Sequence, residues 1–310
     1  MIAALGAAER VLVVGIGGGG DVVGALAVAE LAGLLGRPAI AGGLTWERRP
    51  IDPLPGPRRI GELRDAERIL HEFAALAGPG TTGPGGFHFA ESHVARHTGE
   101  PVLLVDPNGG PAGVAAGLGA AAHALGCDVV VLLDVGGDVL GHGDEAGLAS
   151  PLADAVCLAA APALAATGLT VLLAVFGAGC DGELDPGEVL ERVGEVAVAG
   201  GLLGTWGPGR DELARLRAAV AQVPTEASAM ALRCAGGETG TTEIRAGRRT
   251  VRLTPAGGLV FFLDPLVALR TAARCAALVA GAGSLEEANA ILLARGISTE
   301  LQYECSQPPP

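Results

Sequence analysis

The sequence predicts an α/β protein with a doubly wound, mostly parallel, Rossmann-like sheet and a smaller C-terminal α+β segment. Short aliphatic runs recur along the chain, and stretches with the apolar spacing of amphipathic helices separate most of them. This alternation is typical of βαβ units, in which crossover helices cover both faces of a parallel sheet. The runs are apolar at every position, as expected of strands that are buried on both faces.

Five aliphatic runs are the expected strands of the main sheet, and they span residues 11–14, 39–40, 102–105, 129–133 and 171–176. Most of the stretches between them have helical spacing, and these span residues 65–77, 112–125, 153–166 and 186–199. A run rich in glycine, threonine and proline, 78–86, follows the first expected helix. It is long enough to form a lid or a rim over a site.

The stretch 155–180 carries no charged side chain and is long enough to cross a bilayer. Pro162 and the pair Thr167-Gly168 interrupt it, however, so it is better explained as a helix, a turn and a buried strand. The N-terminus lacks the cationic start and the cleavage site of a signal peptide. We therefore expect a cytoplasmic protein that does not associate with membranes.

The pattern changes after about residue 204. We expect a main α/β domain, 1–204, and a smaller α+β segment, 205–310, which packs on it or is continuous with it. Residues 210–221 have helical spacing, and 241–245 and 249–254 flank a turn typical of a β-hairpin. Ser284 and Glu287 form a capping box at the start of the last expected helix.

Composition excludes several chemistries. The 310 residues carry a formal net charge of -13, and all 21 basic residues are arginine. Without lysine the chain can form neither a Schiff base with pyridoxal phosphate nor the phosphate loop of P-loop NTPases. The acidic excess argues against binding to nucleic acid. Six cysteines without a C-x-x-C pair are typical of free thiols in a reducing compartment.

A glycine-rich loop follows the first expected strand and consists of Gly17, Gly18, Gly19, Gly20 and Asp21. Glycine lets backbone N–H groups approach an anion, and the next helix adds its positive end. The spacing formally matches the dinucleotide fingerprint, but no acidic residue follows about twenty positions later, which disfavours a standard NAD fold. Asp21 fits a ligand contact or a cap for its own helix. We expect the loop to bind the anionic part of a ligand.

Acidic residues follow three other expected strands: Asp106 after the third, Asp134 and Asp138 after the fourth, and Asp181 after the fifth. Each alone fits a turn or a helix cap, but repelling carboxylates at one sheet edge need a reason to be gathered. We expect Asp134, Asp138 and Asp181 to hold a hard cation such as Mg²⁺. Asp134 and Asp138 are also candidate acid or base groups.

Four further residues are candidates at the same edge. Arg48 is placed to bind a carboxylate or a phosphate, and Asn108 to contact a ligand. Cys180 lies in a glycine-rich loop at a strand end, where an exposed thiolate would be a nucleophile and His142 its partner. An inert, buried thiol is the alternative for Cys180.

Five motifs occur along the chain: Gly-Gly-Gly-Gly-Asp at 17–21, Gly-Leu-Thr-Trp-Glu-Arg at 43–48, Asp-Val-Gly-Gly-Asp at 134–138, Gly-Cys-Asp-Gly-Glu-Leu at 179–184 and Pro-Thr-Glu-Ala-Ser at 224–228. Together they resemble a family of uncharacterised bacterial and archaeal proteins that is classed as a domain of unknown function. This resemblance covers most of the chain and implies no established reaction. Over a few residues, the glycine-rich acidic loop is similar to that of D-glutamate cyclases, which are lyases. The Gly-Gly-Asp turn at 136–138 resembles that of phosphofructokinase-like and NAD kinases.

Three expectations about function follow. The first is a cytoplasmic enzyme that acts on a small anionic metabolite, such as a nucleotide, a phosphate ester or an amino-acid-like compound, with Mg²⁺ at the carboxylates. The second is a metal-independent lyase, cyclase or amide-type hydrolase that uses Cys180 or a carboxylate, with Arg48 on the substrate. The third is a non-catalytic metabolite-binding protein. A homo-oligomer is compatible with each of them.

Overall fold

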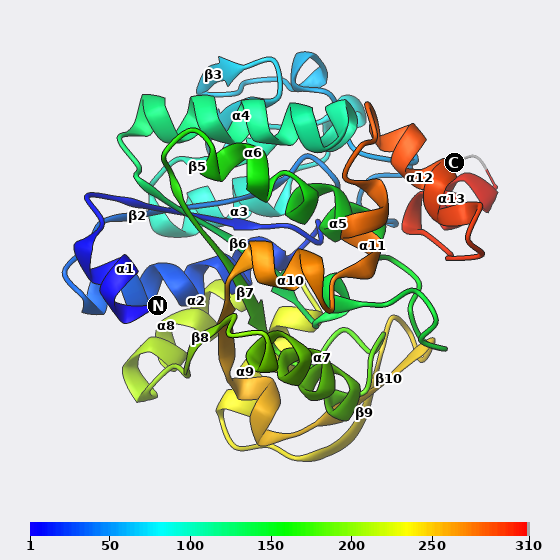
Figure 1. Cartoon of the computed structure of the whole chain (residues 1–310). Helices are drawn as coiled ribbons and strands as arrows, with labels where there is room; N and C mark the ends of the chain where they lie inside the picture. The colour runs from blue at the N-terminus through cyan, green and yellow to red at the C-terminus, as the bar shows by residue number, and fades with distance from the viewer. Residues whose placement is uncertain (309–310) are drawn as a thin grey trace.

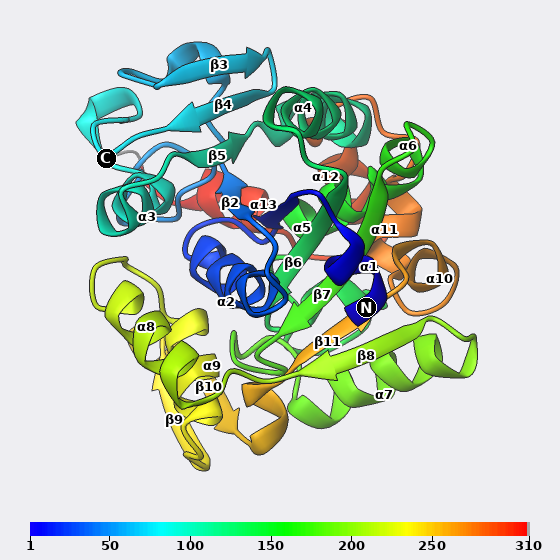
Figure 2. The same cartoon turned by 90° about the vertical axis from the view of Figure 1, so that its left-hand side faces the viewer.

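The computed structural model describes residues 1–308 and confirms the α/β fold class. Within that range, nine strands form one sheet in the order β3-β4-β5-β2-β1-β6-β7-β11-β8, and two more form a separate hairpin, β10-β9. Helices pack on both sides of the sheet (Figure 1). Figure 2 shows the strands one after another, from β3 at the top to β8 at the lower right.

In the described chain, five central strands run parallel and antiparallel strands extend the sheet at both edges. The parallel strands contain the five aliphatic runs, and they are β5 (Val102–Val105), β2 (Ala39–Leu44), β1 (Val11–Gly15), β6 (Val129–Val135) and β7 (Thr170–Phe176). The edge strands are β3 (Arg68–His71), β4 (Ala74–Ala77), β11 (Val260–Leu263) and β8 (Leu202–Trp206). The hairpin consists of β9 (Gly240–Ile244) and β10 (Arg249–Leu253).

The helices contribute to two apolar layers, one on each face of the sheet. The first layer contains side chains of α4 (Gly110–Leu125), α5 (Leu152–Ala159), α6 (Ala161–Ala165), α7 (Pro186–Val198), α10 (Pro265–Arg270), α11 (Arg274–Val279) and α12 (Leu285–Leu293). The second contains side chains of α1 (Ile2–Ala7), α2 (Asp21–Leu34), α3 (Ala90–Thr98), α8 (Arg210–Val220) and α9 (Ala227–Ala235). A last helix, α13 (Glu300–Ser306), lies beside α12 at the right of Figure 1.

Strand β1 shows why both faces are covered. Leu12 and Val14 belong to the first layer, whereas Val11 and Val13 belong to the second. Because successive side chains of a strand point to opposite faces, an apolar side chain at every position requires cover on both sides. The central strands are therefore buried in the middle of the molecule. Because they run parallel, their carboxyl ends lie at the same edge of the sheet.

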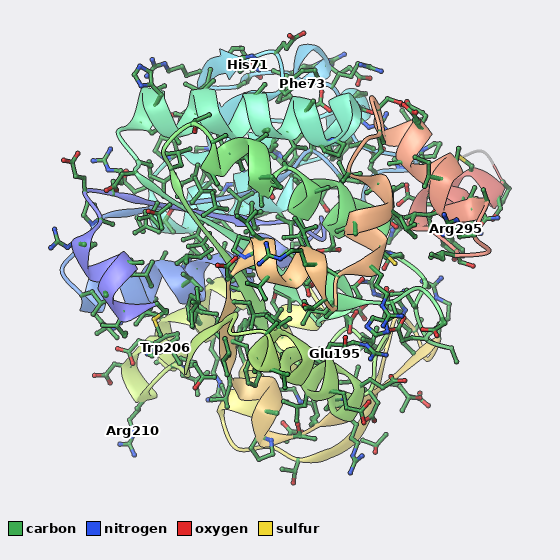
Figure 3. The ribbon with its side chains drawn as sticks, in the orientation of Figure 1. His71, Phe73, Glu195, Trp206, Arg210 and Arg295 are labelled. Atoms are coloured by element: carbon green, nitrogen blue, oxygen red, sulfur yellow. The ribbon has the colours of Figure 1, made fainter. Side chains whose placement is uncertain are left out.

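The expected helix at 65–77 is wrong. The segment forms the antiparallel pair β3–β4, and β4 pairs with β5 at the sheet edge. Phe73, in the turn between the two strands, packs on α4, where the positions of Gly109, Gly113 and Gly117 leave room for its ring. Figure 3 labels His71 and Phe73 at the top of the molecule, above α4. The apolar residues of this segment have helical spacing but lie in two short strands, because pairing with the sheet overrides local propensity.

The C-terminal segment completes the main sheet. Strand β11 pairs with both β7 and β8, so residues on either side of position 204 share one sheet. The helix expected at 210–221 and the hairpin expected after it are confirmed as α8 and β9–β10. Ser284 caps α12 as expected, because its hydroxyl accepts a hydrogen bond from the Glu287 backbone N–H group. This helix is the last one expected from the sequence, but α13 follows it.

The uncharged stretch 155–180 is divided as the sequence predicts. It contains most of α5, then α6, and then strand β7 in the centre of the sheet. Among the described residues, none of the helices has the length and apolar character that crossing a bilayer requires.

Candidate functional site

The main pocket lies where the sheet changes direction. The chain passes from β1 to β2 on one side, and β6 pairs with β1 on the other, so the β1–β6 boundary is a topological switch point. A pocket of about 920 Å³ opens there, beyond the carboxyl ends of these strands. Its walls come from the glycine-rich loop, the ends of β2, β6 and β7, the hairpin turn and α13. The position is the one expected for a ligand in this fold class.

Three carboxylates form what we call the first acid group: Asp21 at the start of α2, Asp134 near the end of β6, and Asp154 in α5. One oxygen of each lies within 4.8 Å of the others. All three are buried and line the pocket. Three separate elements thus bring negative charge to one point.

Hydrogen bonds satisfy the first acid group only in part. Asp21 Oδ2 accepts the N–H groups of Gly17 and Val135, at 3.1 and 3.4 Å, and Asp134 Oδ2 accepts that of Gly137 at 2.9 Å. Asp154 Oδ1 has no hydrogen-bond partner among the described residues, although only 1% of Asp154 is exposed. Within 1–308, no arginine forms an ion pair with any of the three carboxylates.

Burial controls protonation in this group. It raises the pKa of Asp21 to about 7, against the two hydrogen bonds that lower it. Burial and the neighbouring carboxylates raise the pKa values of Asp134 and Asp154 well above their ordinary range. Charged carboxylates are therefore unfavourable here unless a cation compensates them.

Asp138, Asp181 and Glu183 form a second acid group beside the first, with one oxygen of each again within 4.8 Å of the others. Arg249 of β10 compensates it: its Nη1 lies 2.7 Å from Glu183 Oε1 and donates to the Asp181 carbonyl oxygen. Glu183 also accepts the N–H groups of Ala149 and Ser150. Burial and four neighbouring carboxylates raise the pKa of Asp138 well above its ordinary range.

The β9–β10 hairpin brings three arginines to the pocket. The turn of the β9–β10 hairpin carries Arg245, Arg248 and Arg249, and all three line the pocket. Arg245 pairs with Glu226 at 3.4 Å, and Arg248 Nη1 donates to the Tyr303 hydroxyl. The pocket therefore combines an acidic floor with a basic wall.

Arg48 lines the pocket as well but is already engaged. Its guanidinium donates to the Gly17 carbonyl oxygen at 2.7 Å and pairs with Glu300 and Glu304 of α13, at 3.3 and 3.6 Å. It also lies over the Trp46 ring, 4.4 Å from its centroid. Helix α13 thus closes one side of the pocket through Arg48.

The glycine-rich loop uses at least part of its backbone internally. Asp21 accepts the Gly17 N–H group, and the Trp46 carbonyl accepts that of Gly19. Gly17 and Gly20 are required by close packing, because a Cβ at Gly17 would lie 2.6 Å from Asp21 Oδ2 and one at Gly20 would overlap Thr225. The capping role considered for Asp21 is wrong: Gly20 is the N-cap of α2, no side chain among the described residues caps that helix end, and Asp21 accepts instead from Gly17 and Val135. The loop shapes the pocket and positions an acid there.

Three of the candidate residues, Cys180, Asn108 and His142, do not line the pocket. Cys180 is fully buried, and its Sγ lies 3.8 Å from Cys234 Sγ. That contact and burial raise the pKa of the Cys180 thiol. Asn108 donates to Asp106 and to the Pro57 carbonyl, and these bonds brace the loop after β5. None of 78–86, the expected lid, is among the described residues that line the pocket.

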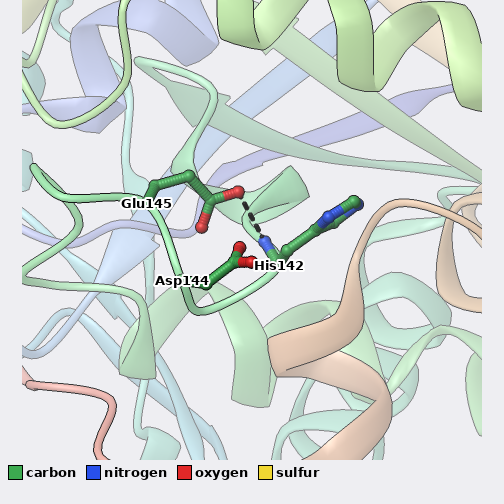
Figure 4. Close-up of side chains that lie close together, drawn as sticks. All are labelled: His142, Asp144 and Glu145. Carbon is green, nitrogen blue, oxygen red and sulfur yellow. Dashed lines mark hydrogen bonds between the residues drawn. The ribbon is translucent and has the colours of Figure 1, made fainter.

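Among the described residues His142 forms no hydrogen bond with Cys180, and its Nε2 lies 3.0 Å from Glu195 Oε2 on α7. Together with Asp144 and Glu145 it forms a small cluster (Figure 4), in which Glu145 accepts the His142 backbone N–H bond. Arg192 pairs with both Glu145 and Glu195, so a cation already lies in this cluster. The His142–Cys180 pair is absent from the described structure.

Sequence reasoning missed several pocket residues, among them Asp154, Glu183, Arg245, Arg249 and Glu300. Asp154 had a detectable signal, since it is the only charged side chain in the otherwise apolar helix Leu152–Ala159. Such a charge is expensive to bury unless it has a function or a partner. Arg245, Arg249 and Glu300 come from segments that are distant in sequence from the ends of the parallel strands, so only tertiary packing brings them to the pocket.

Comparison with the curated proteins and with the solved structures found no match. The profile of one protein family does match, over residues 12–307, and confirms the resemblance seen in the motifs. The family is described as a protein of unknown function. Because the match covers nearly the whole chain, including every residue of the two acid groups, this protein belongs to the DUF1152 family.

Proposed function

We propose that the protein is an enzyme that depends on a divalent cation and acts on a small anionic metabolite. The cation would bind at the first acid group, Asp21, Asp134 and Asp154. The observation that carries the proposal is Asp154, a buried carboxylate in the pocket whose Oδ1 lacks a hydrogen-bond partner within the described chain.

The donor set fits a hard cation. Mg²⁺ is usually bound by one or two carboxylates and completes its shell with water and substrate oxygens, and Ca²⁺ and Mn²⁺ also prefer oxygen. In the cation-free protein, burial and repulsion favour protonated carboxyls at this point. A divalent cation would replace those protons and remove the repulsion.

Asp138 is the expected proton-transfer residue. It lines the pocket and belongs to the second acid group, and burial and the neighbouring carboxylates raise its pKa, which favours the protonated form. A carboxylic acid beside a bound anion can donate that proton to a leaving group. This role keeps Asp138 next to the cation without making it a ligand, whereas the sequence alone suggested that it binds the metal.

The test is cation binding by the full chain after treatment with EDTA. Titration with MnCl₂ or MgCl₂, followed by calorimetry and by the melting temperature, should show binding to the folded state. Asp154→Asn should weaken the affinity by at least about tenfold, because it removes a charged ligand. The variant keeps the size of the side chain, so the fold should be retained.

Asp144→Asn is the matched control, because Asp144 belongs to the only acid cluster with a histidine among the described residues that could hold a metal. That variant should bind the cation like the wild type. If the wild-type protein binds no divalent cation, or if Asp144→Asn loses binding and Asp154→Asn does not, the proposed site is wrong.

A further inference from the structure

We propose that the ligand of the main pocket is a metal-complexed oligophosphate, a compound with two or more linked phosphates. A divalent cation would hold it on the acidic side of the pocket and the hairpin arginines on the other. The inference rests on the cation-dependent function proposed above and names the chemical class of its substrate.

The composition of the pocket favours an anion that enters together with a cation. Among the described residues, ten carboxyl side chains and five arginines line it. If these carboxyls are charged, an anion that enters without a cation meets an excess of negative charge, and if they are protonated, it finds no cation on the acidic side to bind it. A cation that arrives with the anion reverses this balance on the acidic side.

Arg245 points to where the anion would lie. Its Nε is 3.4 Å from Glu226 but donates no hydrogen bond within the described chain, and this atom is buried. Burial, followed by the charges of Arg249 and Arg48, lowers the pKa of Arg245. A partly desolvated guanidinium near two others is stabilised when an anion lies among them.

The two sides of the pocket have complementary deficits. Among the described residues, Asp154 Oδ1 accepts no hydrogen bond, and Arg245 Nε donates none, although it is ion-paired with Glu226 at 3.4 Å. Phosphate oxygens satisfy both kinds of group at once, since they coordinate divalent cations and accept hydrogen bonds from guanidinium groups. A substrate with phosphates would thus connect the two walls.

The size of the pocket favours more than one phosphate. At about 920 Å³ it is at the upper end of ligand pockets, which hold molecules of drug or cofactor size. Its arginines also continue outward, from Arg249 beside the second acid group to the exposed Arg248. Tyr303, with its ring 5.8 Å from the Arg248 guanidinium, offers a flat surface at the mouth for the organic part of an ester.

The experiment uses the full chain and simple probes. Orthophosphate, pyrophosphate, tripolyphosphate and citrate are each titrated with and without MgCl₂, and binding is followed by calorimetry and melting temperature. Pyrophosphate and tripolyphosphate should bind when Mg²⁺ is present, and at least about tenfold more weakly when it is absent. Orthophosphate and citrate should bind more weakly than both.

Two arginine variants assign the binding. Arg245→Gln should weaken the affinity for Mg²⁺-pyrophosphate by about tenfold or more, which is the effect expected from the loss of one charge-assisted contact to phosphate. Its Mn²⁺ affinity should equal that of the wild type, which also shows that the variant is folded. Arg68→Gln, at an exposed position of β3 outside the pocket, should behave like the wild type.

The outcomes separate the two proposals. Cation binding without any oligophosphate binding would overturn this inference and leave the cation-dependent function standing. Oligophosphate binding that ignores Mg²⁺, that citrate matches, or that survives in Arg245→Gln would also overturn it. A wild-type protein that binds no cation at all would instead remove the function on which the inference rests.

Discussion

The two acid groups have similar composition and opposite surroundings. Each gathers three buried carboxylates within 4.8 Å, and both line the same pocket. The second has Arg249 at 2.7 Å from Glu183, whereas no described arginine pairs with the first, and Asp154 Oδ1 lacks any partner there. One group is internally compensated and the other is not.

This difference separates a compensated carboxylate, Glu183, from an uncompensated one, Asp154. A buried carboxylate that has an ion pair and several N–H donors stabilises the fold, and its removal lowers the free energy of unfolding. A buried carboxylate without a partner costs stability while it is present, so it has to be explained by something that binds to it. Substitutions that remove one charge from each group should therefore have opposite effects.

The largest effect is expected for Glu183→Gln. It breaks the ion pair with Arg249 and weakens the bonds from Ala149 and Ser150, so the free energy of unfolding should fall by about 3 kcal/mol. Urea denaturation in EDTA measures it. Asp154→Asn, measured in parallel, should be neutral or stabilising, because it removes repulsion and no ion pair.

The comparison would fail if both variants lost stability equally. It would also fail if Glu183→Gln were neutral, since Arg249 would then not be compensating the second acid group. Arg68→Gln, which changes an exposed arginine outside the pocket, serves as the reference for a surface substitution.

A smaller effect is expected at a third set of buried carboxyls, Glu91 and Glu47, of which only Glu47 lines the pocket. Glu91 is 1% exposed, both of its oxygens lack partners in the described chain, and it does not line the pocket. Gly43 makes room for it, because a Cβ there would overlap Glu91 Oε1. Burial raises the pKa of Glu47 to about 7, and burial and Glu47 raise that of Glu91 well above its ordinary range.

The raised pKa values of Glu47 and Glu91 determine the direction in which stability changes with pH. The folded protein binds more protons than the unfolded chain, so the stability that they contribute is complete at acid pH, below the unfolded pKa near 4.5. The contribution of Glu47 is lost as the pH rises through about 7, and that of Glu91 is lost as the pH rises through its own raised pKa. Glu91→Gln should reduce this loss by up to about 1.4 kcal/mol per pH unit.

The measurement is urea unfolding between about pH 5 and pH 8.5 in EDTA, with Glu72→Gln at an exposed position as the control. Because Glu91 lies outside the pocket lining, Mn²⁺ affinity should not change. A pH dependence identical to that of the wild type would show that this carboxyl is not protonated on folding.

The centre of the fold was accessible from the sequence, and its edges were not. Runs that are apolar at every position identify strands buried on both faces, and all five such runs are central parallel strands. The segment that contains Phe73 has helical spacing, and only its pairing with β5 makes it a strand. The local sequence pattern does not predict this pairing, because it depends on a strand that is distant in the sequence.

The same distinction applies to the pocket. The rule that ligands bind at strand ends places Asp21, Asp134, Asp138 and Asp181 at one edge, and all four line the pocket, whereas Asp106, expected at the same edge, does not. Arg249 reaches it from a separate hairpin, so its role depends on tertiary packing. Cys180 also follows a strand end, but its side chain points into the core, because the direction of one loop residue is not determined by its place in the sequence.

Cys180 provides the prediction with the smallest effect. Its thiol is fully buried beside Cys234 and lies outside the pocket lining, although the next residue, Asp181, belongs to the second acid group. Cys180→Ala should cost about 1 kcal/mol of stability and leave the binding of Mn²⁺ and of Mg²⁺-pyrophosphate unchanged. Iodoacetamide should label Cys305, the exposed cysteine, before any other in the folded protein, as intact mass would show. Rapid labelling of Cys180 that bound ligand prevents, or loss of ligand binding in a stable Cys180→Ala variant, would move the chemistry from the two acid groups to the thiol behind them.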